Sequence, residues 1–236
     1  VYYQQKPFPD SPISKIFTDS RKIYGDEHAL FVALKGPNYD GHAFVHKAYD
    51  KGIRLFLVEQ FQETLAPDAL QLKVTNTLHA LHQWAVHVRK QFFGKVIAVT
   101  GSNGKTMFKE WLSTLLEEEI PVYKNPKSYN SQLGVPLSLI PLNNQSAVAI
   151  LEAGISTVGE MEKLARLIKP KLGVFTHLGS AHDEGFSSRE EKLTEKLKLF
   201  KETQDLILPE VLYRNYQEKI KAELLLGCFS VFSGAL

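Results

Sequence analysis

The stretch VIAVTGSNGKTMFKEWLSTLL, residues 96–116, joins a β-branched apolar run to a loop with two glycines and then to a helical pattern. The apolar run predicts a buried strand, and the apolar spacing after Lys105 predicts a helix. Between them, Gly101 and Gly104 let backbone N–H groups turn inward around an anion, and the N-terminus of the helix adds partial positive charge. The stretch therefore predicts a phosphate-binding loop at a strand-to-helix junction.

Two side chains at the end of this loop carry the chemistry. Lys105 can reach terminal phosphates, and the Thr106 hydroxyl can ligate Mg²⁺. The loop matches only the short form G-x-x-G-K-T, because Val99 stands near the position of the first glycine in G-x-x-x-x-G-K-[ST]. The alternative is a tight turn without a ligand. We favour the phosphate loop because strand, loop and helix fall where the motif needs them.

The chain around and after this loop alternates between strands and helices. Strands are predicted at residues 96–99, 147–151, 172–176, 205–208 and 228–232, and helices at residues 105–118, 159–168, 188–200 and 210–225. Alternation with continuous apolar strands predicts a parallel sheet covered on both faces. Ligands of such sheets bind at the carboxyl ends of the strands, so each strand-to-helix junction is a candidate site.

The part of the chain before this block predicts a smaller α/β lobe. Its predicted elements are strands at residues 13–17, 30–34, 55–58 and 70–74, a helix at residues 40–52 and a long helix at residues 77–93. We therefore expect an N-terminal domain at residues 1–76 and a central domain at residues 77–236.

Composition narrows the classes of partner. The 236 residues carry a formal net charge of +2, which gives no electrostatic case for nucleic acid as the main partner. The single cysteine, Cys228, excludes an internal disulfide and suits a reducing compartment. No apolar run reaches the roughly 18 residues that span a bilayer, and the start lacks the regions of a signal peptide. We expect a cytoplasmic protein that is not embedded in a membrane.

Three further residues lie near the carboxyl edge of the predicted sheet. Glu152 ends an apolar strand and can hold Mg²⁺, although a capping or salt-bridging role is an equal alternative. His182 lies in a glycine-flanked loop and can reach a metal or a phosphate, although a lone loop histidine is more often structural. Lys196 falls on the apolar face made by Leu193 and Phe200, where it either extends to solvent or is held for a purpose.

Polar turns supply the remaining candidates. Asn130 lies in a polar loop near the same sheet edge, with hydroxyl neighbours on both sides. In the first block, Ser20, Arg21, Gly41 and His42 lie in turns. Arginine, hydroxyls and a glycine turn together can recognise a diphosphate, and ordinary turn chemistry is an equally good account of each residue alone.

Taken together, these stretches resemble the Mur ligases, the ATP-dependent amide ligases of bacterial cell-wall precursor synthesis. The resemblance covers nearly the whole chain and rests on TDSRKI, LFVALKGPNYDGHAFVHKA, VTGSNGKT, YNSQLGVPLSL, EAGISTVGEMEKLARLIKP and GSAHDEGFSSREEKLTEKLKLF. It implies an α/β fold with a small N-terminal lobe and a phosphate-loop, parallel-sheet central domain. Family members have a third, C-terminal domain, which we expect to be absent from these 236 residues.

The resemblance is strongest to the member that joins D-Ala-D-Ala to a UDP-N-acetylmuramoyl tripeptide through an acyl phosphate. It implies ATP and Mg²⁺ at two sites as cofactors, and a carbamylated lysine at Lys196. By resemblance, the nucleotide is held by Gly101, Ser102, Asn103, Gly104, Lys105, Thr106 and Asn130. Mg²⁺ is ligated by Thr106, Glu152 and His182, and the catalytic residues are Lys105, His182 and Lys196. Ser20, Arg21, Gly41 and His42 hold the UDP end of the substrate.

Some expectations concern the protein beyond its site. The wording SNGKTMFKEWL and SYNSQLGVPLS resembles the variant fused to an alanine racemase. Without a third domain, these residues alone are expected to be inactive. The alternatives are the preceding, diamino-acid-adding Mur ligase, a folate polyglutamate ligase, or a non-catalytic nucleotide-binding module of a fusion protein. Glu152, His182 and Lys196 together argue against the last of these.

Overall fold

The computed structural model describes residues 2–3, 12–24, 26, 28–180, 183–224 and 230–234. Contacts within the chain divide it into two compact units, Val1–Gln83 and Trp84–Leu236. This division falls inside helix α2 (Thr77–Gln91), whereas the boundary predicted from the sequence, between residues 76 and 77, coincides with the start of that helix.

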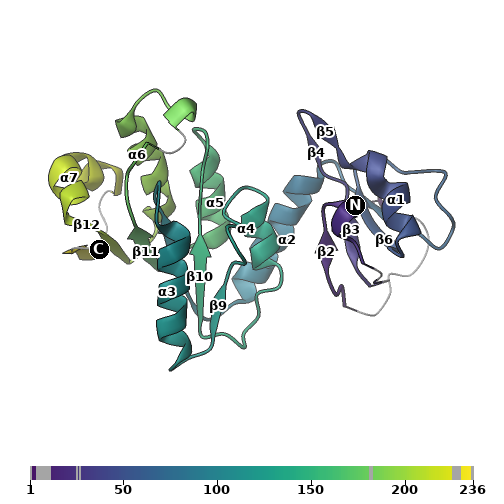
Figure 1. The fold of residues 1–236 in the computed structure, drawn as a ribbon, viewed down its shortest axis with the longest axis horizontal. Coiled ribbons are helices and arrows are strands. Elements are labelled where there is room, and N and C mark those ends of the chain that lie inside the picture. The colour runs from purple at the N-terminus through teal and green to yellow at the C-terminus, as the bar shows by residue number, and fades with distance from the viewer. Residues whose placement is uncertain are drawn as a thin grey trace. The chain divides into compact units, whose positions relative to one another are not determined.

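The N-terminal unit is built on a mixed five-stranded sheet of order β1-β7-β6-β3-β2 (Figure 1). Its sheet strands are β1 (Tyr2–Tyr3), β2 (Ile16–Phe17), β3 (Leu30–Val32), β6 (Leu55–Val58) and β7 (Leu70–Lys73). All neighbours pair in parallel except β1, which pairs antiparallel with β7. The other elements are η1 (Ser20–Lys22), the hairpin strands β4 (Lys35–Gly36) and β5 (Tyr39–Asp40), η2 (Gly41–Phe44) and α1 (Val45–Asp50).

The helix predicted at residues 40–52 is two elements. The Asp40 carboxylate accepts a hydrogen bond from the His42 backbone N–H and caps the 3₁₀ turn η2, and α1 follows from Val45. A separate buried core, which includes Phe31, Val45 and Phe56, lies beneath these elements.

The second unit contains the predicted parallel sheet, with the order β13-β12-β11-β8-β10-β9. Its strands are β8 (Lys95–Thr100), β9 (Val122–Lys124), β10 (Val148–Glu152), β11 (Leu172–Phe175), β12 (Asp205–Pro209) and β13 (Ser230–Gly234), and every pair is parallel. Its helices after α2 are α3 (Lys105–Glu117), α4 (Gly134–Leu139), α5 (Glu160–Ile168), α6 (Arg189–Leu197) and α7 (Glu210–Leu224), with 3₁₀ turns η3 (Asp183–Gly185) and η4 (Lys198–Phe200).

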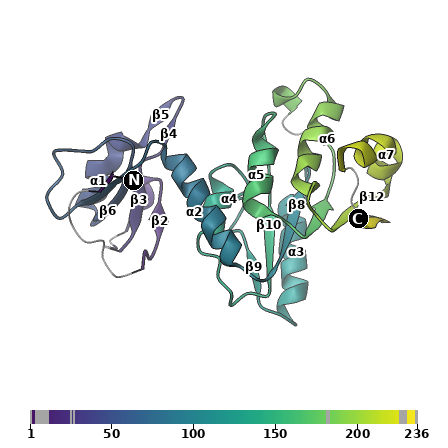
Figure 2. The ribbon, with the colours of Figure 1, turned by 180° about the vertical axis from the view of Figure 1, so that it is seen from behind.

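Helices cover both faces of this sheet, as its apolar strands require. Phe108, Leu112 and Leu116 of α3 pack on one face against Ile97 and Val99. Residues of α2, α4, α5, α6 and α7 join the larger core on the other face, and Figures 1 and 2 show the two layers from opposite sides. The α/β fold predicted from the sequence is confirmed.

In the second unit, one strand and one α-helix were not predicted, and in the N-terminal unit the two-residue strands β1, β4 and β5 were not predicted. Strand β9 has only three residues, and helix α4 contains Pro136 and begins at Gly134 without a capping side chain. Both lack the periodic signal on which sequence interpretation depends. The last strand, predicted at residues 228–232, lies at Ser230–Gly234.

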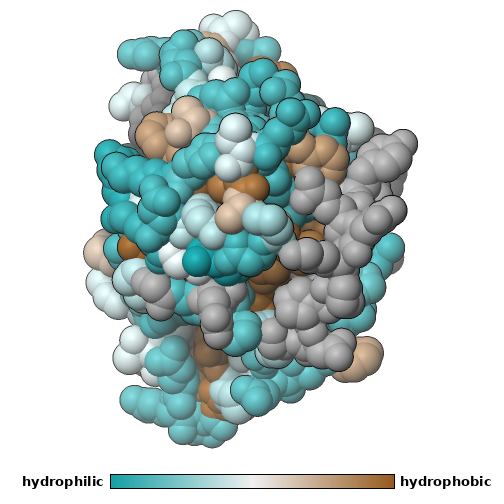
Figure 3. Space-filling view, turned by 90° about the vertical axis from the view of Figure 1, so that its right-hand side faces the viewer, coloured by the Kyte–Doolittle hydropathy of each residue, from teal (hydrophilic) through white to brown (hydrophobic). Residues whose placement is uncertain are grey.

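On the face of the molecule that Figure 3 shows, the coloured residues are mostly hydrophilic, with hydrophobic areas between the polar groups. Among the helices that the structure describes, none is both long and apolar enough to cross a membrane.

Candidate functional site

The loop of residues 101–104 connects β8 to α3 and adopts a conformation that requires glycine. Gly101 has φ of 148° and Gly104 has φ of 80°. A Cβ atom on Gly101 would lie 2.2 Å from Thr176 Oγ1 and 2.9 Å from the backbone nitrogen of His177. The first glycine therefore allows a close backbone approach, and both allow a left-handed conformation.

The segment after β11 supports this loop from behind. The Ser102 N–H donates to the His177 carbonyl at 2.7 Å, and the Ser102 hydroxyl donates to the Gly179 carbonyl at 3.0 Å. The Thr176 hydroxyl donates to the Asn103 carbonyl at 2.6 Å. The loop is thus fixed in place by its neighbours in the protein.

Lys105 folds back over the loop from the first turn of α3. Its ammonium donates to the carbonyls of Gly101 at 2.9 Å and Ser102 at 3.1 Å. Burial lowers the pKa of Lys105, while the nearby Glu152 carboxylate opposes the shift and Lys192 adds to it. The Lys105 ammonium therefore lies within reach of an anion bound by the loop.

Thr106, Glu152 and Asn130 meet at the carboxyl ends of β8 and β10. The Thr106 hydroxyl donates to Glu152 Oε2 at 2.8 Å, and the Asn130 amide donates to Glu152 Oε1 at 2.6 Å. Glu152 is 1% exposed. A carboxylate and a hydroxyl beside a phosphate loop suit Mg²⁺, which prefers oxygen ligands and shares them with phosphates and water.

The oxygen atoms of Glu152 and Thr106 therefore fit the magnesium-bound nucleotide that the sequence predicts. Within the described parts of the chain, no group of three or more His, Cys, Asp or Glu side chains could hold a metal by itself. His182, predicted as a catalytic residue and metal ligand, lies outside the described residues.

The sequence left open whether the Lys196 side chain extends to solvent, and in the structure it does not. It is 2% exposed on α6, and its ammonium lies 3.3 Å from the Gly101 carbonyl, to which it donates. Burial, followed by the charges of Lys105 and Lys192, lowers the pKa of Lys196 to about 7. The structure thus brings this lysine to the phosphate loop.

Some residues at the site were missed by sequence interpretation. Lys192 is fully buried one helical turn before Lys196, and its ammonium donates to the Gly179 carbonyl at 2.6 Å. Lys109 is fully buried one turn after Lys105. Their neighbours at helical spacing are mostly polar, such as Thr106 and Ser113 for Lys109 and Ser188 and Glu195 for Lys192, so no apolar stripe marks them in the sequence as it does Lys196.

The N-terminal unit holds an open pocket of about 440 Å³ in which two of its predicted residues lie. Its lining residues are Thr18, Asp19, Ser20, Arg21, Tyr39, Phe44 and Lys47. The rings of Tyr39 and Phe44 stack at 5.7 Å between centroids. The Arg21 guanidinium, hydrogen-bonded to Asp19 at 2.8 Å, holds the pKa of that carboxyl well below its usual range.

Gly41 and His42 are not among the lining residues of this pocket. The Glu59 N–H donates to His42 Nε2 at 2.8 Å, so the ring proton is on Nδ1, which donates to Asp40 at 2.6 Å. Gly41 is buried, and a Cβ there would lie 2.7 Å from the backbone nitrogen of Leu34. Both residues shape the turn between β5 and α1, and their contact with a substrate stays a prediction.

The fold and this geometry define an α/β protein of the phosphate-loop class. Residues 99–224 match the Mur ligase middle domain, and residues 12–89 match the domain described as Mur ligase family, catalytic domain. The first of these matches alone covers more than half of the chain. The chain therefore belongs to the Mur ligase family.

Individual relatives carry a more specific name. The chain is 33% identical over 192 residues to the UDP-N-acetylmuramoyl-tripeptide–D-alanyl-D-alanine ligase of Bacillus subtilis, covering 81% of this chain and 42% of the relative. A crystal structure of MurF from Acinetobacter baumannii matches with a TM-score of 0.86 at 28% identity, over 98% of this chain and 50% of that one. MurF ligase from Thermotoga maritima in complex with ADP matches with a TM-score of 0.76 at 26% identity, over 92% and 50% of the two chains.

Proposed function

We propose that this chain provides the ATP-binding and UDP-substrate-binding parts of an ATP-dependent ligase that joins D-Ala-D-Ala to a UDP-N-acetylmuramoyl tripeptide. The observation that carries the proposal is the junction of Thr106, Glu152 and Asn130 beside Lys105, in a family member whose reported relatives have that name. Because the chain spans only about 42% of the Bacillus subtilis relative, the activity of the whole protein belongs to this proposal.

The proposed reaction has two transfers. An oxygen of the peptide carboxylate forms a bond to the γ-phosphorus of ATP, and the bond from that phosphorus to the ADP oxygen breaks. The amine of D-Ala-D-Ala then bonds to the acyl carbon, loses a proton, and phosphate leaves. Both steps bring anions together, so clustered positive charge and positioning are the main contributions of the protein.

The residues divide these tasks. The backbone of residues 101–104 and the Lys105 ammonium hold the phosphates, which places a cation against the charge of the transferring group. Thr106 and Glu152 would hold Mg²⁺, which neutralises phosphate charge when bound. Asn130 orients the Glu152 carboxylate through its 2.6 Å hydrogen bond. A second Mg²⁺ at His182 is part of the same proposal.

We also propose that Lys196 is carbamylated. A neutral amine can add CO₂, and the lowered pKa of about 7 gives Lys196 a substantial neutral fraction near neutrality. With ¹³C-labelled bicarbonate, a carbamate signal in the NMR spectrum is expected from the wild-type protein and not from Lys196→Met. Equal spectra from the two proteins would contradict the assignment.

The pocket around Ser20 and Arg21 is the proposed UDP site. Arg21 supplies a guanidinium that can contact a diphosphate, and the stacked Tyr39 and Phe44 rings offer an aromatic wall. The wall gives the pocket an apolar side next to its charged side, as a nucleotide requires.

The cytoplasmic location and the inactivity of these residues alone stay predictions. The reported relatives have ligase names, so they give no support to the predicted fusion with an alanine racemase. The diamino-acid-adding ligase remains the alternative in the same family, because it would use the same phosphate loop.

An assay of ATP-dependent phosphate release tests the proposal in the complete protein. Release is expected only when ATP, the UDP-muramoyl tripeptide and D-Ala-D-Ala are all present. Turnover with a diamino acid and the UDP-muramoyl dipeptide, and none with D-Ala-D-Ala, would establish the alternative ligase instead.

A further inference from the structure

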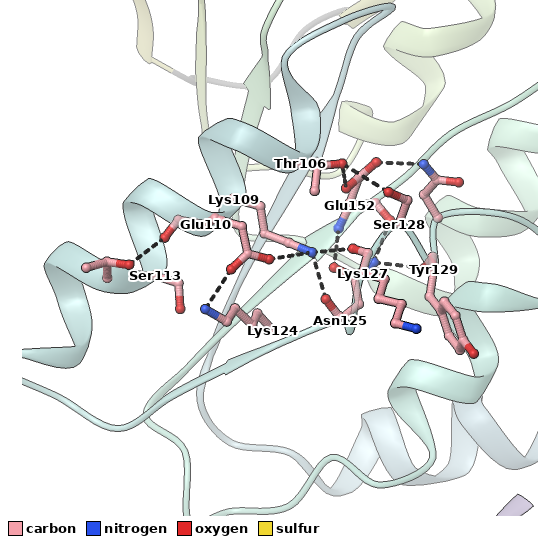
Figure 4. A network of polar contacts seen from close by, with 12 residues as sticks. Thr106, Lys109, Glu110, Ser113, Lys124, Asn125, Lys127, Ser128, Tyr129 and Glu152 are labelled. Carbon is pink, nitrogen blue, oxygen red and sulfur yellow. Dashed lines mark hydrogen bonds and ion pairs between the residues drawn. The ribbon is translucent and has the colours of Figure 1, made fainter.

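Lys109 is a fully buried lysine that the proposed reaction does not use directly. Its ammonium donates to the carbonyl of Asn125 at 2.8 Å and to that of Lys127 at 2.5 Å, and it lies 3.2 Å from the Glu110 carboxylate (Figure 4). Three acceptors match the three donors of an ammonium. A charge so far from solvent is stable only with such partners, and two of them belong to one loop.

That loop, residues 125–130, has a backbone that its own sequence does not favour. Lys127 adopts φ of 51°, in the left-handed region that non-glycine residues seldom occupy. Its carbonyl is one of the two that accept from Lys109. The surrounding structure therefore has to maintain this conformation, and Lys109 is the buried group that bonds to it.

The same loop clamps the strand that ends at Glu152. The Asn125 side chain is fully buried, accepts from the Glu152 N–H at 3.0 Å and donates to the Tyr129 carbonyl at 2.8 Å. The Gly154 N–H donates to the Asn130 carbonyl at 2.8 Å. The loop is thus bonded to the main chain on both sides of the metal-site carboxylate.

The loop also presents side chains to the site. Ser128 Oγ lies 3.3 Å from Thr106 Oγ1, and the Asn130 amide donates to Glu152. Figure 4 shows Ser128, Thr106 and the Glu152 carboxylate grouped together, with the Lys109 ammonium bonded to Asn125 and Lys127 next to them. Three oxygen-bearing side chains from three separate segments therefore depend on one loop for their spacing.

We propose that Lys109 is a positioning residue of the nucleotide–magnesium site, which acts through the 125–130 loop to hold Glu152 and the Ser128 hydroxyl against Thr106. The proposal rests on the proposed function and extends it to a residue that touches neither nucleotide nor metal. Groups that orient metal ligands in this way commonly change metal affinity when they are removed.

Calorimetric titration of ADP into the 236-residue chain, with Mg²⁺ and then with EDTA, tests this role. Lys109→Met keeps the length of the side chain and removes its donors. We expect it to weaken ADP binding in Mg²⁺ by roughly 10- to 100-fold and to change binding in EDTA far less. Ser113→Ala is the matched control, because Ser113 is equally buried on α3 but donates only to Glu117.

A folded Lys109→Met protein with wild-type affinity in Mg²⁺ would overturn the proposal, as would an equal loss with and without Mg²⁺. If the wild-type chain bound no ADP under any condition, the proposed nucleotide role would itself be contradicted. The two failures are therefore distinguished by the wild-type titration.

Hydrogen exchange on the unchanged protein decides the question even if Lys109→Met does not fold. Backbone amides of residues 125–130 are expected to exchange more slowly with ADP and Mg²⁺ than with ADP and EDTA. Exchange in this loop that does not respond to the metal would overturn the proposal, because the loop would then be independent of the site.

Discussion

At the scale of single residues, the site is a concentration of lysines with little solvent around them. Lys105, Lys192 and Lys196 all donate to carbonyls of the phosphate loop or of Gly179 behind it. Lys192 lowers the pKa of both other lysines, which shows that the charges repel one another. The negative charge of a bound polyphosphate would attract all three ammonium groups and offset this repulsion. The repulsion is therefore greatest in the protein without its ligand.

Lys105→Ala should therefore abolish function without loss of the fold. We expect at least about a 10²-fold fall in ligase rate in the complete protein, since removal of one charge-stabilising donor typically costs about 3–4 kcal/mol of barrier. ADP titration of this chain should show the same loss. Lys163→Ala, an exposed lysine of α5, is the control and should match the wild type. Turnover near wild type in Lys105→Ala would contradict the phosphate-loop assignment.

Lys196 should make stability depend on alkaline pH. Its pKa falls from the usual 10.5 to about 7 in the folded protein, so between these values the unfolded chain binds more protons. The free energy of unfolding should then rise as pH increases from about 7 to about 10.5. Urea denaturation at several pH values should show a smaller rise for Lys196→Met. Parallel curves for the two proteins would mean that this lysine is charged in the fold.

At the scale of elements, the junction of β8 and α3 depends on close approach of two backbones. The segment after β11 lies against Gly101, and its hydroxyl and carbonyl groups bond to residues 102 and 103. Parallel pairing of β8 with β11 brings the two segments together, because both leave the sheet at the same edge. The shape of the loop is therefore a property of two elements.

Gly101→Ala and Gly159→Ala separate this effect from simple backbone strain. Both glycines have positive φ, but a Cβ on Gly159 meets nothing within 4 Å, while one on Gly101 would clash with Thr176. We expect Gly159→Ala to cost about 1–2 kcal/mol in unfolding free energy and to leave ADP binding unchanged. Gly101→Ala should lose more stability and most of the ADP affinity. Equal behaviour of the two variants would show that the close approach is unimportant.

At the scale of the whole molecule, the chain has two units with separate buried cores. The proposed ligands divide between them in the same way. The phosphate loop and Glu152 belong to the second unit, and the pocket around Arg21 belongs to the first. Each unit can therefore be tested through its own ligand.

Arg21→Ala should weaken binding of the UDP-linked substrate and leave ADP affinity nearly unchanged. Loss of a charge-assisted hydrogen bond of about 1.5–3 kcal/mol corresponds to at least tenfold in affinity. Arg21 is largely exposed, so its removal should not disturb the fold. Calorimetry with each ligand provides the measurement. Weaker ADP binding with an unchanged UDP-substrate would show that the two roles are assigned to the wrong units.

Local pattern alone was enough for several features of this protein. The apolar run before Gly101, the Lys-Thr pair after Gly104 and the Ser188 cap of α6 each depend on neighbouring residues in the chain. For this reason the strands of the central block, the phosphate loop and the position of Glu152 at a strand end could be predicted. Short or irregular elements such as β9 and α4 have no such pattern.

Other features depend on residues that are distant in sequence. The strand order β13-β12-β11-β8-β10-β9 and the antiparallel β1 follow from packing of whole elements. Lys192 and Lys196 belong to the site only because the fold brings their ammonium groups to the carbonyls of Gly179 and Gly101. In the sequence, Lys109 looks like any helical lysine, and only the packing of α3 against the 125–130 loop shows its hydrogen bonds to that loop. Sequence periodicity indicates which face of an element is buried. Only the tertiary structure decides which group of another element lies against that face, because packing between elements that are distant in sequence sets the distances between their side chains.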